Sequence, residues 1–580
     1  MHEVNQWPAP SSGLAVRTDE AKARRIHRKL VAQVNEQDHA KTRATLRSAI
    51  ESWLARHARP IAAAGIESTS VTGDGLPSGV RRAELLAALS VATDLGLGLP
   101  EEHVLRQTII ARRVAELAGL PSAMQESLVS TSLLAWVGCV ADSYEMAHWF
   151  GDDRRLRSES YAVDKAGPRM LRFLVEQVER DAGPLRRLTA IGRFLVAGGL
   201  PAAAGSMVTH CQTTGDIAER LGLPADVGRA LGQAFERWDG RGVPGRVRGA
   251  DLEPVIRVVQ IADDAEQHHR AFGVEAALTM LRERRGTEFD PELVDLVCAH
   301  ADAVFAGLDE ATVDLASDEL SEDELTHALR TFGDYADLKS PAFLGHSAAV
   351  AVLAADAADK LGMPASDVVL VERAALVHDL GVHGVSAGVW AKPGPLSVAE
   401  WERVRMHPYL TERTLARVPR LAEVGAVAAL HHERLDGSGY PRGLRGDSIP
   451  VAARVLAAAV RYRTAREERP HRPSADADAA AGLLRADAAA GRLDGEAVGA
   501  VLAAAGHRVR RRPTLPAGLT PREAEVLGLV ARGLSNKAAA ERLGLAPRTV
   551  GSHVEHIYTK IGVSTRGAAA MFAMRHGLVD

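Results

Sequence analysis

The chain has 580 residues, which is too long for one hydrophobic core, and we expect about three or four domains. Hydrophobic residues make up 46% of it and charged residues 25%, as in ordinary soluble globular proteins. The net charge of −4 excludes a chain that binds polyanions over its whole surface, and leaves a local basic patch open. The three scattered cysteines exclude a disulfide framework and fit a reducing compartment.

The start of the chain and the length of its apolar segments predict the cellular compartment of the protein. The chain opens without a signal peptide, and no apolar run reaches the roughly 18 residues needed to span a bilayer. We therefore expect a cytoplasmic protein with no membrane partner. Alanine is abundant, aromatic residues make up only 4%, and strand signals are scarce. The expected fold class is mainly α.

Residues 1–78 form an N-terminal extension that we expect to be partly disordered. Its first residues include prolines and serines, and its end is rich in serine, threonine and glycine, as in linkers. Residues 19–57 are charged and carry apolar residues at loosely helical spacing. This segment is either a solvated helix or a helix that binds a partner.

Two stretches of the chain repeat each other. Residues 103–121 and 346–364 both begin with histidine, end with proline and have the same length. In both stretches a glycine follows the final proline by 17 positions. Further on, residues 235–249 match residues 432–446. Agreement at several separated anchors indicates a duplicated helical domain.

The duplication sets the expected domain boundaries. The first copy covers residues 79–308 and the second residues 309–507, with an insertion of roughly 45 residues around 150–200 in the first copy. The acidic run at 309–324 is either a linker or the first helix of the second copy. Within each copy, apolar residues recur at helical spacing, and Gly-Leu-Pro or Gly-Met-Pro ends a helix.

The second copy concentrates metal-binding residue types. The stretch 431–441 places two adjacent histidines and a glutamate before a glycine-rich turn, and His378 and Asp379 lie upstream. Neutral imidazole and carboxylate groups are ligands for first-row metals. Glycines let the backbone turn sharply and approach a ligand closely. We predict a metal site beside a loop that is able to approach a phosphate.

Residues 344–473 resemble the HD-GYP branch of the HD phosphohydrolases. The motifs that carry the resemblance are Gly345-His346, His378-Asp379-Leu380-Gly381, Met406-His407-Pro408, the HHERLDGSGYP run at 431–441, and Arg469-Pro470-His471-Arg472-Pro473. The resemblance implies a helical bundle that holds two divalent transition metals, iron or manganese. It implies hydrolysis of a cyclic dinucleotide, typically cyclic di-GMP. The implied metal ligands are His346, His378, Asp379, His407, His431 and His432.

The chemistry of a dinuclear centre agrees with these roles. Two metals lower the pKa of a bridging water and hold phosphoryl oxygens for in-line attack. The resemblance places His378 and Asp379 at the catalytic centre, with Asp379 as the bridge. Arg442 and Arg445, beside the loop, either bind phosphate oxygens or are solvated. Tyr440, at the end of the loop, is a further candidate for ligand binding.

Several positions depart from the family pattern. The lysine that usually follows the His-Asp motif is Val382, and the usual metal-binding aspartate of a later helix is Val460. A second aspartate is replaced by Arg463, and the glutamate associated with a third metal by Ala342. Water fills a coordination place, but it does not supply the lost negative charge. The second copy is therefore either an active phosphodiesterase or a site that has kept binding without hydrolysis.

The first copy has lost most of these ligands. The positions of the four missing ligands hold Ala135, Trp136, Ala234 and Phe235. His103 and His210 remain, and Asp263 stands where the second copy has Val460. This set does not hold a dinuclear centre, and we expect a structural or regulatory role. A further hypothesis lets Asp263 complete the second copy's site across an interface.

Residues 517–580 predict a separate helical domain, joined through a basic linker at 508–516. Thr520 and Glu523 form a capping box at the start of its first helix. Three further helices are expected at 535–544, 547–561 and 565–576. A short helix, a glycine turn and a longer helix are typical of a helix-turn-helix, whose second helix enters the major groove.

This domain resembles the LuxR-type DNA-binding domain over its whole length. The resemblance is carried by Leu519-Thr-Pro-Arg-Glu, Gly533-Leu-Ser-Asn-Lys, Arg548-Thr-Val and Ile557-Tyr-x-Lys-Ile-Gly-Val. It implies binding to double-stranded DNA and a fourth helix that supports a homodimer. The residues implied on the groove-facing side are Thr549, Ser552 and His553. The candidates for phosphate contacts are Lys537, Arg548 and Lys560.

Two positions depart from the LuxR pattern. Ala546 replaces the usual Ser or Thr cap of the recognition helix, a loss of about 1 kcal/mol. Gly551 replaces a common lysine, costs about 1 kcal/mol inside a helix, and removes a basic contact. We expect DNA binding that is weakened or dependent on dimerisation.

Three functions are compatible with the whole chain. The first is a LuxR-type transcriptional regulator whose HD-GYP-like region senses a ligand or metal. The second is an active metal-dependent cyclic di-GMP phosphodiesterase with a DNA-binding output domain. Val382 and Val460 favour the sensor, whereas the retained histidines and Asp379 favour the enzyme. The third reading treats both copies as oligomerisation scaffolds.

Overall fold

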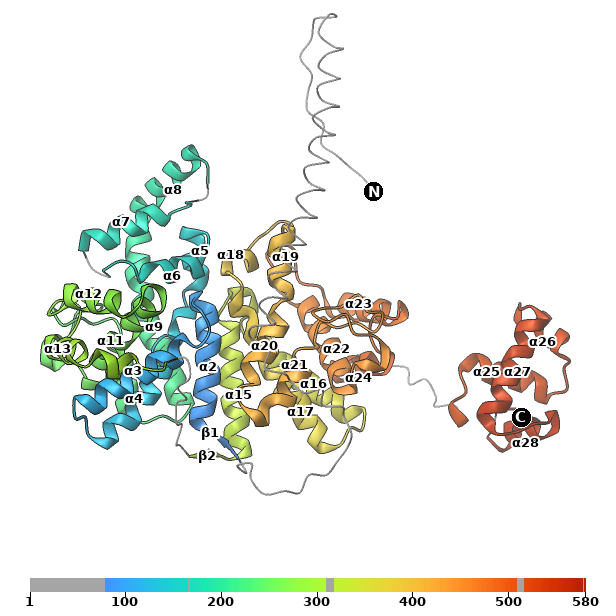
Figure 1. Ribbon diagram of the computed structural model, residues 1–580. Coiled ribbons are helices and arrows are strands. Elements are labelled where there is room, and N and C mark those ends of the chain that lie inside the picture. Colours follow the sequence, from blue (N-terminus) through green and yellow to red (C-terminus); the bar gives the residue numbers. More distant parts are fainter. Residues whose placement is uncertain are drawn as a thin grey trace, which may run out of the picture. The chain divides into compact units, whose positions relative to one another are not determined.

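The computed structural model describes residues 79–164, 167–180, 182–308, 318–507, 516–576 and 578–579. The extension at 1–78 and most of the basic linker lie outside these residues, so their interpretation stays a prediction. Helices dominate the described part, where the strands β1 (Val80–Arg81) and β2 (Glu319–Leu320) form a single antiparallel pair. The mainly α fold class is confirmed (Figure 1).

The two copies share one helix plan, which confirms the duplication. In the first copy it consists of α2 (Arg82–Leu97), α3 (His103–Leu117), α4 (Ser122–Leu134), α10 (Ala225–Leu231) and α11 (Pro254–Phe272). In the second copy it consists of α15 (Glu322–Asp337), α16 (His346–Lys360), α17 (Ala365–Val377), α21 (Ala422–Ala428) and α22 (Val451–Arg466). Gly119 and Gly362, with φ of 68° and 73°, follow α3 and α16 as the expected helix stops.

Each copy is completed by shorter elements. The first copy adds η1 (Val137–Val140), η2 (Gly249–Asp251), α12 (Val274–Arg284), α13 (Pro291–Ala299) and α14 (Ala301–Phe305). The second copy adds η3 (Pro341–Phe343), η4 (Leu380–Gly384), α18 (Ala387–Trp390), α19 (Val398–Arg405), α20 (His407–Leu415), η5 (Pro419–Leu421), η6 (Gly446–Ser448), α23 (Ala477–Ala489) and α24 (Gly495–Ala504).

The expected insertion in the first copy is a helical subdomain. It comprises α5 (Ser143–Phe150), α6 (Asp153–Ser160), α7 (Gly167–Gln177), α8 (Pro184–Val196) and the long α9 (Gly199–Arg220). Its own apolar cluster includes Phe150, Phe173 and Phe194. Burial of this cluster stabilises the fold of the inserted helices.

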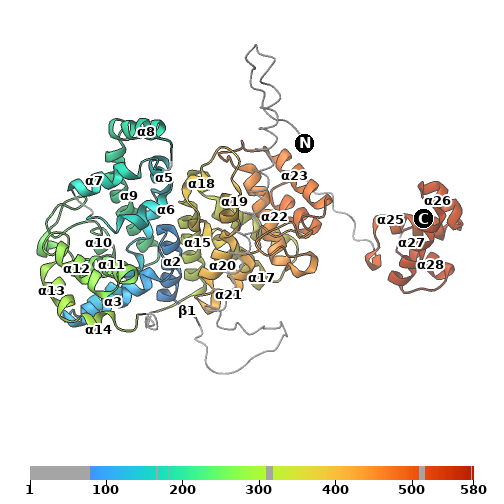
Figure 2. The same cartoon turned by 45° about the horizontal axis from the view of Figure 1, so that its top comes forward.

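The two copies share one hydrophobic core. Helices α2 and α15 lie side by side at the junction in both views (Figure 1 and Figure 2), and Thr93 Oγ1 lies 3.3 Å from the Tyr335 hydroxyl between them. Buried residues of both helices, such as Leu89 and Phe332, belong to one continuous cluster. The described end of the acidic run is the start of the second copy, because Ser321 caps α15.

One segment has the length and apolar composition of a membrane span, contrary to the expectation from the sequence. It is Pro341–Lys360, with a mean hydropathy of 1.3, and half of it is buried. Within it, α16 packs against α17, α22 and α24 and begins at the buried His346. We assign this segment to the core of the second copy, where such hydropathy is expected.

The last helices form a small domain with its own core. They are α25 (Pro521–Ala531), α26 (Asn536–Leu543), α27 (Pro547–Ile561) and α28 (Arg566–Arg575), following a turn η7 (Pro516–Gly518). Val526, Val550 and Ile557 are buried at its centre. The capping box of Thr520 and Glu523 is present as predicted. Ala546 makes no side-chain cap, as its sequence requires.

Candidate metal centre

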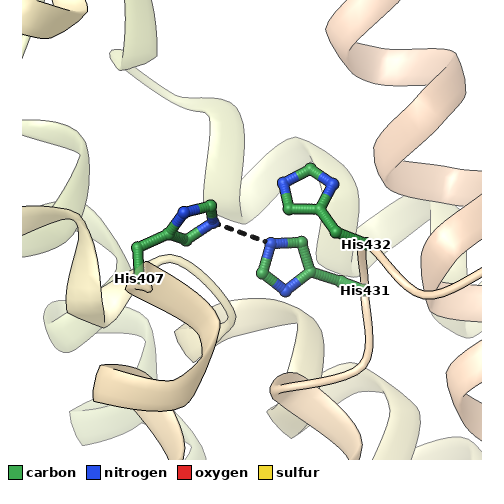
Figure 3. Close-up of side chains that lie close together, drawn as sticks. All are labelled: His407, His431 and His432. Carbon is green, nitrogen blue, oxygen red and sulfur yellow. Dashed lines mark hydrogen bonds between the residues drawn. The ribbon is translucent and has the colours of Figure 1, made fainter. Parts of the chain in front are cut away.

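The six predicted metal ligands converge in the second copy, at the ends of four of its helices. They form two groups: His346, His378 and Asp379; and His407, His431 and His432. Within each group the potential ligand atoms lie within 4.8 Å of one another. Figure 3 shows the second group, with the His407 and His431 rings facing each other.

Asp379 lies between the two histidines of its own group, His346 and His378, and the three histidines of the other group. Its Oδ1 is 3.4 Å from Nε2 of His407 and 3.5 Å from Nε2 of His431. Its Oδ2 is 3.4 Å from Nε2 of His378 and 3.9 Å from Nε2 of His346. Each oxygen of one carboxylate thus faces one group of histidines, which is the position of a ligand that bridges two metals.

Backbone contacts fix the tautomers of three of these histidines. His378, His407 and His431 each donate Nδ1–H to the carbonyl three residues earlier, at 2.7, 2.6 and 2.7 Å. Each of these imidazoles therefore carries a proton on Nδ1, which leaves Nε2 as the nitrogen that is available to a metal. Such hydrogen bonds orient metal-ligating imidazoles and fix the nitrogen that binds the metal.

The lone pairs of these histidines fit metal ions. Nε2 of His407 and Nε2 of His431 are 3.1 Å apart, a separation at which one metal ion can bind both nitrogens. Nε2 of His378 is buried and has no hydrogen-bond partner in the described part of the chain. Leaving such an atom unsatisfied costs about 1–3 kcal/mol. The mixed imidazole and carboxylate set suits divalent transition metals.

The electrostatics keep the ligands in their metal-binding forms. Burial lowers the pKa values of His378, His431 and His432, so these side chains are neutral at pH 7. Burial alone would raise the pKa of Asp379, but the neighbouring His378 and His407 hold it well below its usual range. The centre therefore offers imidazole nitrogens around one ionised carboxylate.

Two glutamates that the sequence reasoning did not assign support the site. Nδ1 of His346 lies 2.8 Å from Glu467 Oε2, which leaves Nε2 of this histidine directed at the centre. Glu433, buried after the paired histidines, accepts backbone N–H bonds from Arg442 at 2.7 Å and Leu444 at 2.9 Å. These bonds hold the glycine-rich loop against the metal ligands. The adjacency of Glu433 to His431-His432 was its only signal in the sequence.

A cavity of about 410 Å³ opens beside His431 and His432. Tyr440, which we predicted as a ligand-binding residue, lines it, with its ring centre 4.6 Å from that of His432. The cavity also contains Arg405, Arg434 and Arg461. The guanidinium of Arg405 lies 5.7 Å from the centre of the Tyr440 ring, in cation–π range.

The two arginines chosen from the sequence lie elsewhere. Arg442 is exposed and forms an ion pair with Glu412. Arg445 is also exposed and packs against the turn at Gly437. Neither belongs to the lining of the cavity. The loop directs these side chains outward, so the arginines that line the cavity come from α19, α22 and position 434 instead, together with the carboxylates of Glu433 and Asp487.

The residues that depart from the family pattern lie in or next to the candidate site. Val460 lines the cavity and is 4% exposed, so it provides no carboxylate at that wall. Val382 is buried in η4. Arg463 pairs with Glu467 at 3.5 Å instead of offering a ligand. The two candidate groups are thus rich in imidazole, and Asp379 is the one carboxylate that they contain among the described residues.

In the first copy, an ion-pair cluster around His103 occupies the place that corresponds to the His346 group of the second copy. Nε2 of His103 lies 2.9 Å from Asp263 Oδ1, and its Nδ1 contacts Glu266. Burial lowers the pKa of His103, but hydrogen bonds to Asp263 and Glu266 outweigh it and raise the pKa to about 10. The hypothesis that Asp263 completes the second copy's site is wrong, because Asp263 is buried in its own copy, bound to His103 and Tyr161.

The predicted DNA-contacting residues form a partly exposed face of the last domain. Arg548, Thr549 and Ser552 are exposed on α27, and Lys537 is exposed on α26. His553 is half-buried. Lys560 lies 2.8 Å from Glu523 Oε2 and thereby ties α27 to the start of α25. Its role as a phosphate contact stays a prediction.

Comparison with known families identifies two kinds of domain. The HD domain family matches residues 205–293 and 330–497, that is, the end of the first copy and most of the second. The bacterial regulatory proteins of the luxR family match residues 517–573.

The related proteins are bacterial phosphodiesterases. The 3′3′-cGAMP-specific phosphodiesterase 3 of Vibrio cholerae is 29% identical over 414 residues, covering 69% of this chain and 90% of that protein. The cyclic di-GMP phosphodiesterase response regulator RpfG of Xanthomonas campestris is 38% identical over 155 residues, covering 26% of this chain and 40% of that protein. A crystal structure of a cyclic GMP-AMP-specific phosphodiesterase of V. cholerae has a TM-score of 0.51 and 25% identity, covering 74% of this chain and 98% of that one.

Proposed function

We propose that this chain, which joins tandem HD domains of the HD-GYP phosphodiesterase kind to a LuxR-family regulatory domain, is a cytoplasmic transcriptional regulator. In this proposal the second copy binds a cyclic dinucleotide at a dinuclear metal centre, and the bound state controls DNA binding. The proposed partners are double-stranded DNA, a cyclic dinucleotide and a second copy of the chain.

The position of Asp379 between the two histidine groups carries the proposal. Its two oxygens face separate groups at 3.4–3.9 Å, as expected for a bridge between metals. His346 and His378 would hold one metal, and His407, His431 and His432 the other. Iron and manganese suit this set of nitrogen and oxygen donors. When bound, the pair of metals supplies Lewis acidity toward a phosphodiester and acidifies a coordinated water.

The cavity beside the centre supports a cyclic dinucleotide as the ligand. Arg405 and Arg434 place positive charge in its lining, which suits the phosphates, whereas Arg461 is paired with Asp487 of the same lining at 2.8 Å. Tyr440 offers an aromatic face, and its burial raises the pKa of its hydroxyl, so the hydroxyl stays protonated and able to donate. Its volume of about 410 Å³ lies in the usual range for small-molecule sites.

Hydrolysis of the bound dinucleotide is the second candidate function. It is favoured by the convergence of all six predicted ligands and by the relatives, which are phosphodiesterases. Val460 disfavours it, because the missing carboxylate leaves the first half of the centre with only Asp379 to balance the metal charge. Binding without turnover is therefore the leading proposal.

Metal analysis of the anaerobically purified protein, combined with nucleotide assays, separates the two candidates. We expect about two transition metals per chain and binding of cyclic di-GMP or 3′3′-cGAMP, both lost in an Asp379→Asn variant. Arg442→Ala, which changes an exposed side chain of the same loop, serves as the control. Turnover that disappears with Asp379→Asn would establish the enzyme instead. Absence of both metal and nucleotide binding in the wild type would contradict both candidates.

The proposed output requires nucleotide binding to alter DNA binding. A gel-shift titration with and without cyclic di-GMP measures this coupling directly. Equal DNA affinity in both conditions, for a protein shown to bind the nucleotide, would contradict the regulatory part of the proposal.

A further inference from the structure

The first copy contains a partly open cavity at the positions that correspond to the metal centre of the second copy. The space has a volume of about 310 Å³. Three of its walls occupy ligand positions of the repeat: Trp136 at the position of Asp379, His210 at that of His407, and Phe235 at that of His432. The remaining walls come mainly from α6, α7 and α9 of the inserted subdomain. We call this space the first-copy cavity.

His210, which lines the first-copy cavity, has a ring nitrogen without a hydrogen-bond partner in the described part of the chain. His210 is 2% exposed, and its Nε2–H donates to the carbonyl of Ala135 at 2.8 Å. Its Nδ1 is buried and has no hydrogen-bond partner in the described part of the chain. Burial lowers the pKa of His210 to about 4, so Nδ1 carries a lone pair at neutral pH. Such an orphaned acceptor costs about 1–3 kcal/mol unless a donor satisfies it.

The charges in the lining are already neutralised. Arg157 and Asp142, the charged side chains that line the cavity, pair with each other. Arg157 also lies 3.1 Å from Asp153 Oδ2. A charged ligand would therefore find no free counter-ion in this lining and would lose its hydration on entry. The aromatic rings of Trp136 and Phe235, 5.9 Å apart, favour an apolar ligand instead.

We propose that the first-copy cavity binds an uncharged, largely aromatic small molecule with one hydroxyl or N–H group, which donates to Nδ1 of His210. The loss of the metal ligands thereby converted the first site from a metal centre to an apolar receptor site. Its volume lies at the lower end of the range for small-molecule pockets.

A buried network connects this cavity to the second copy. Asp153, one turn of α6 before Arg157, accepts hydrogen bonds from Ser386 Oγ at 2.8 Å and from Ala387 N at 2.9 Å. It also pairs with the fully buried Lys339 at 2.7 Å. Ser386 follows η4, the turn that begins directly after Asp379. Occupation of the cavity thus acts on the segment that holds the bridging carboxylate, and this regulatory step rests on the proposed function.

Equilibrium dialysis of the full-length protein with three matched probes tests the site. The probes are 2-naphthol, which has a donor; naphthalene, which has none; and 2-naphthoate, which is charged. We expect one 2-naphthol per chain, naphthalene binding weaker by about tenfold, and no binding of 2-naphthoate. Equal binding of all three probes, or no binding of 2-naphthol, would overturn the proposal.

Three variants localise the binding. Ser206→Phe on α9 fills the cavity and should abolish 2-naphthol binding, whereas Thr209→Phe, at an exposed position on the same helix, should leave it unchanged. His210→Phe keeps the ring but removes the acceptor, and should lower 2-naphthol affinity to that of naphthalene. This variant decides the matter if Ser206→Phe does not fold. Unchanged 2-naphthol affinity in His210→Phe would contradict the assigned hydrogen bond.

The regulatory step has a separate readout. Saturating 2-naphthol should shift the metal affinity of the second copy, and Asp153→Asn should remove this shift while 2-naphthol still binds. Binding without any shift in the wild type would overturn the connection and leave the site standing. Because dialysis with 2-naphthol requires neither metal nor nucleotide, failure of the proposed function does not affect that test.

Discussion

Nε2 of the protonated His103 donates a hydrogen bond of 2.9 Å to Oδ1 of Asp263 in the first copy. In the repeat, His103 corresponds to His346 and Asp263 to Val460. The first copy therefore shows that a carboxylate at this position of α11, the counterpart of α22, reaches the histidine that corresponds to His346. In the second copy the same position is apolar, which leaves Asp379 as the one carboxylate in the candidate group with His346 and His378.

Restoring this carboxylate should strengthen the metal centre. We predict that Val460→Asp raises the affinity for the metal held by His346 and His378 by roughly tenfold or more, since even outer partners of metal ligands change affinity by about that much. Turnover of a cyclic dinucleotide should rise in parallel. Metal content after dialysis against a chelator measures the first effect. Val460→Asn, which has the same shape without the charge, is the control, and an equal gain in both variants would contradict the prediction.

The pH dependence of stability should reveal the buried imidazolium of the first copy. The folded-state pKa of His103 is about 10, above its unfolded value of 6.5. The stabilisation is therefore fully present below pH 6.5 and is lost as the pH rises toward 10, with a slope of up to about 1.4 kcal/mol per pH unit. Chemical unfolding of the wild type and of His103→Ala between pH 7 and 10 measures it. Parallel pH profiles for the two proteins would contradict the assignment.

The convergence of the six candidate ligands and the helices were predictable from the sequence because both depend on local or repeated patterns. His378-Asp379 and His431-His432 are short motifs, and the helix stops at Gly119 and Gly362 need only a left-handed backbone. Likewise, the capping box of Thr520 lies within four residues.

The cavity wall was not predictable in the same way. Arg405 and Arg461 reach it because α19 and α22 pack on either side of the paired histidines, and no local pattern fixes that packing. Arg442 and Arg445 are nearer in sequence, yet the bonds from Glu433 to the loop backbone turn their side chains outward. The contact of Lys339 with Asp153 joins residues 186 positions apart and depends on how the two copies meet.

The arginines of the cavity wall should outweigh those of the loop in binding a phosphodiester. We predict that Arg405→Ala weakens binding of cyclic di-GMP by about tenfold or more, as expected for loss of a charged hydrogen-bond donor. Arg442→Ala should have little effect, because this side chain is exposed and engaged with Glu412. Titration calorimetry on the metal-loaded protein measures both. A larger loss of cyclic di-GMP affinity in Arg442→Ala than in Arg405→Ala would contradict this prediction and indicate that the loop arginines bind the phosphates.

The buried ion pair between the copies should be a large contributor to stability. Lys339 and Asp153 both have fully buried side chains. We predict that Asp153→Ala destabilises the protein by about 3–5 kcal/mol, because it leaves an unpaired buried charge. Glu176→Ala, which removes an exposed ion pair with Arg172 in the same subdomain, should cost less than about 1 kcal/mol. Denaturant unfolding compares them, and equal losses would show that the burial of the pair carries no special weight.

The glycine in the recognition helix offers a direct test of the DNA-binding face. A Cβ at Gly551 would meet only Asn536 Nδ2, at 4.0 Å, so a longer side chain fits without a clash. We predict that Gly551→Lys tightens binding to double-stranded DNA, both by favouring the helix by up to about 1 kcal/mol and by adding a phosphate contact. The slope of log affinity against log salt concentration should then become more negative by about one, as expected for the release of one more counterion.

A second glycine supplies the matched control for this test. Gly567 lies on α28, where a Cβ would meet nothing within 4 Å. Gly567→Lys adds the same charge and the same helix preference away from α27, and should leave the salt slope unchanged. Fluorescence anisotropy with a random-sequence duplex at several salt concentrations measures both variants. Because net charge alone would steepen both slopes equally, a difference between them assigns the phosphate contact to the face of α27 that carries Arg548 and Ser552.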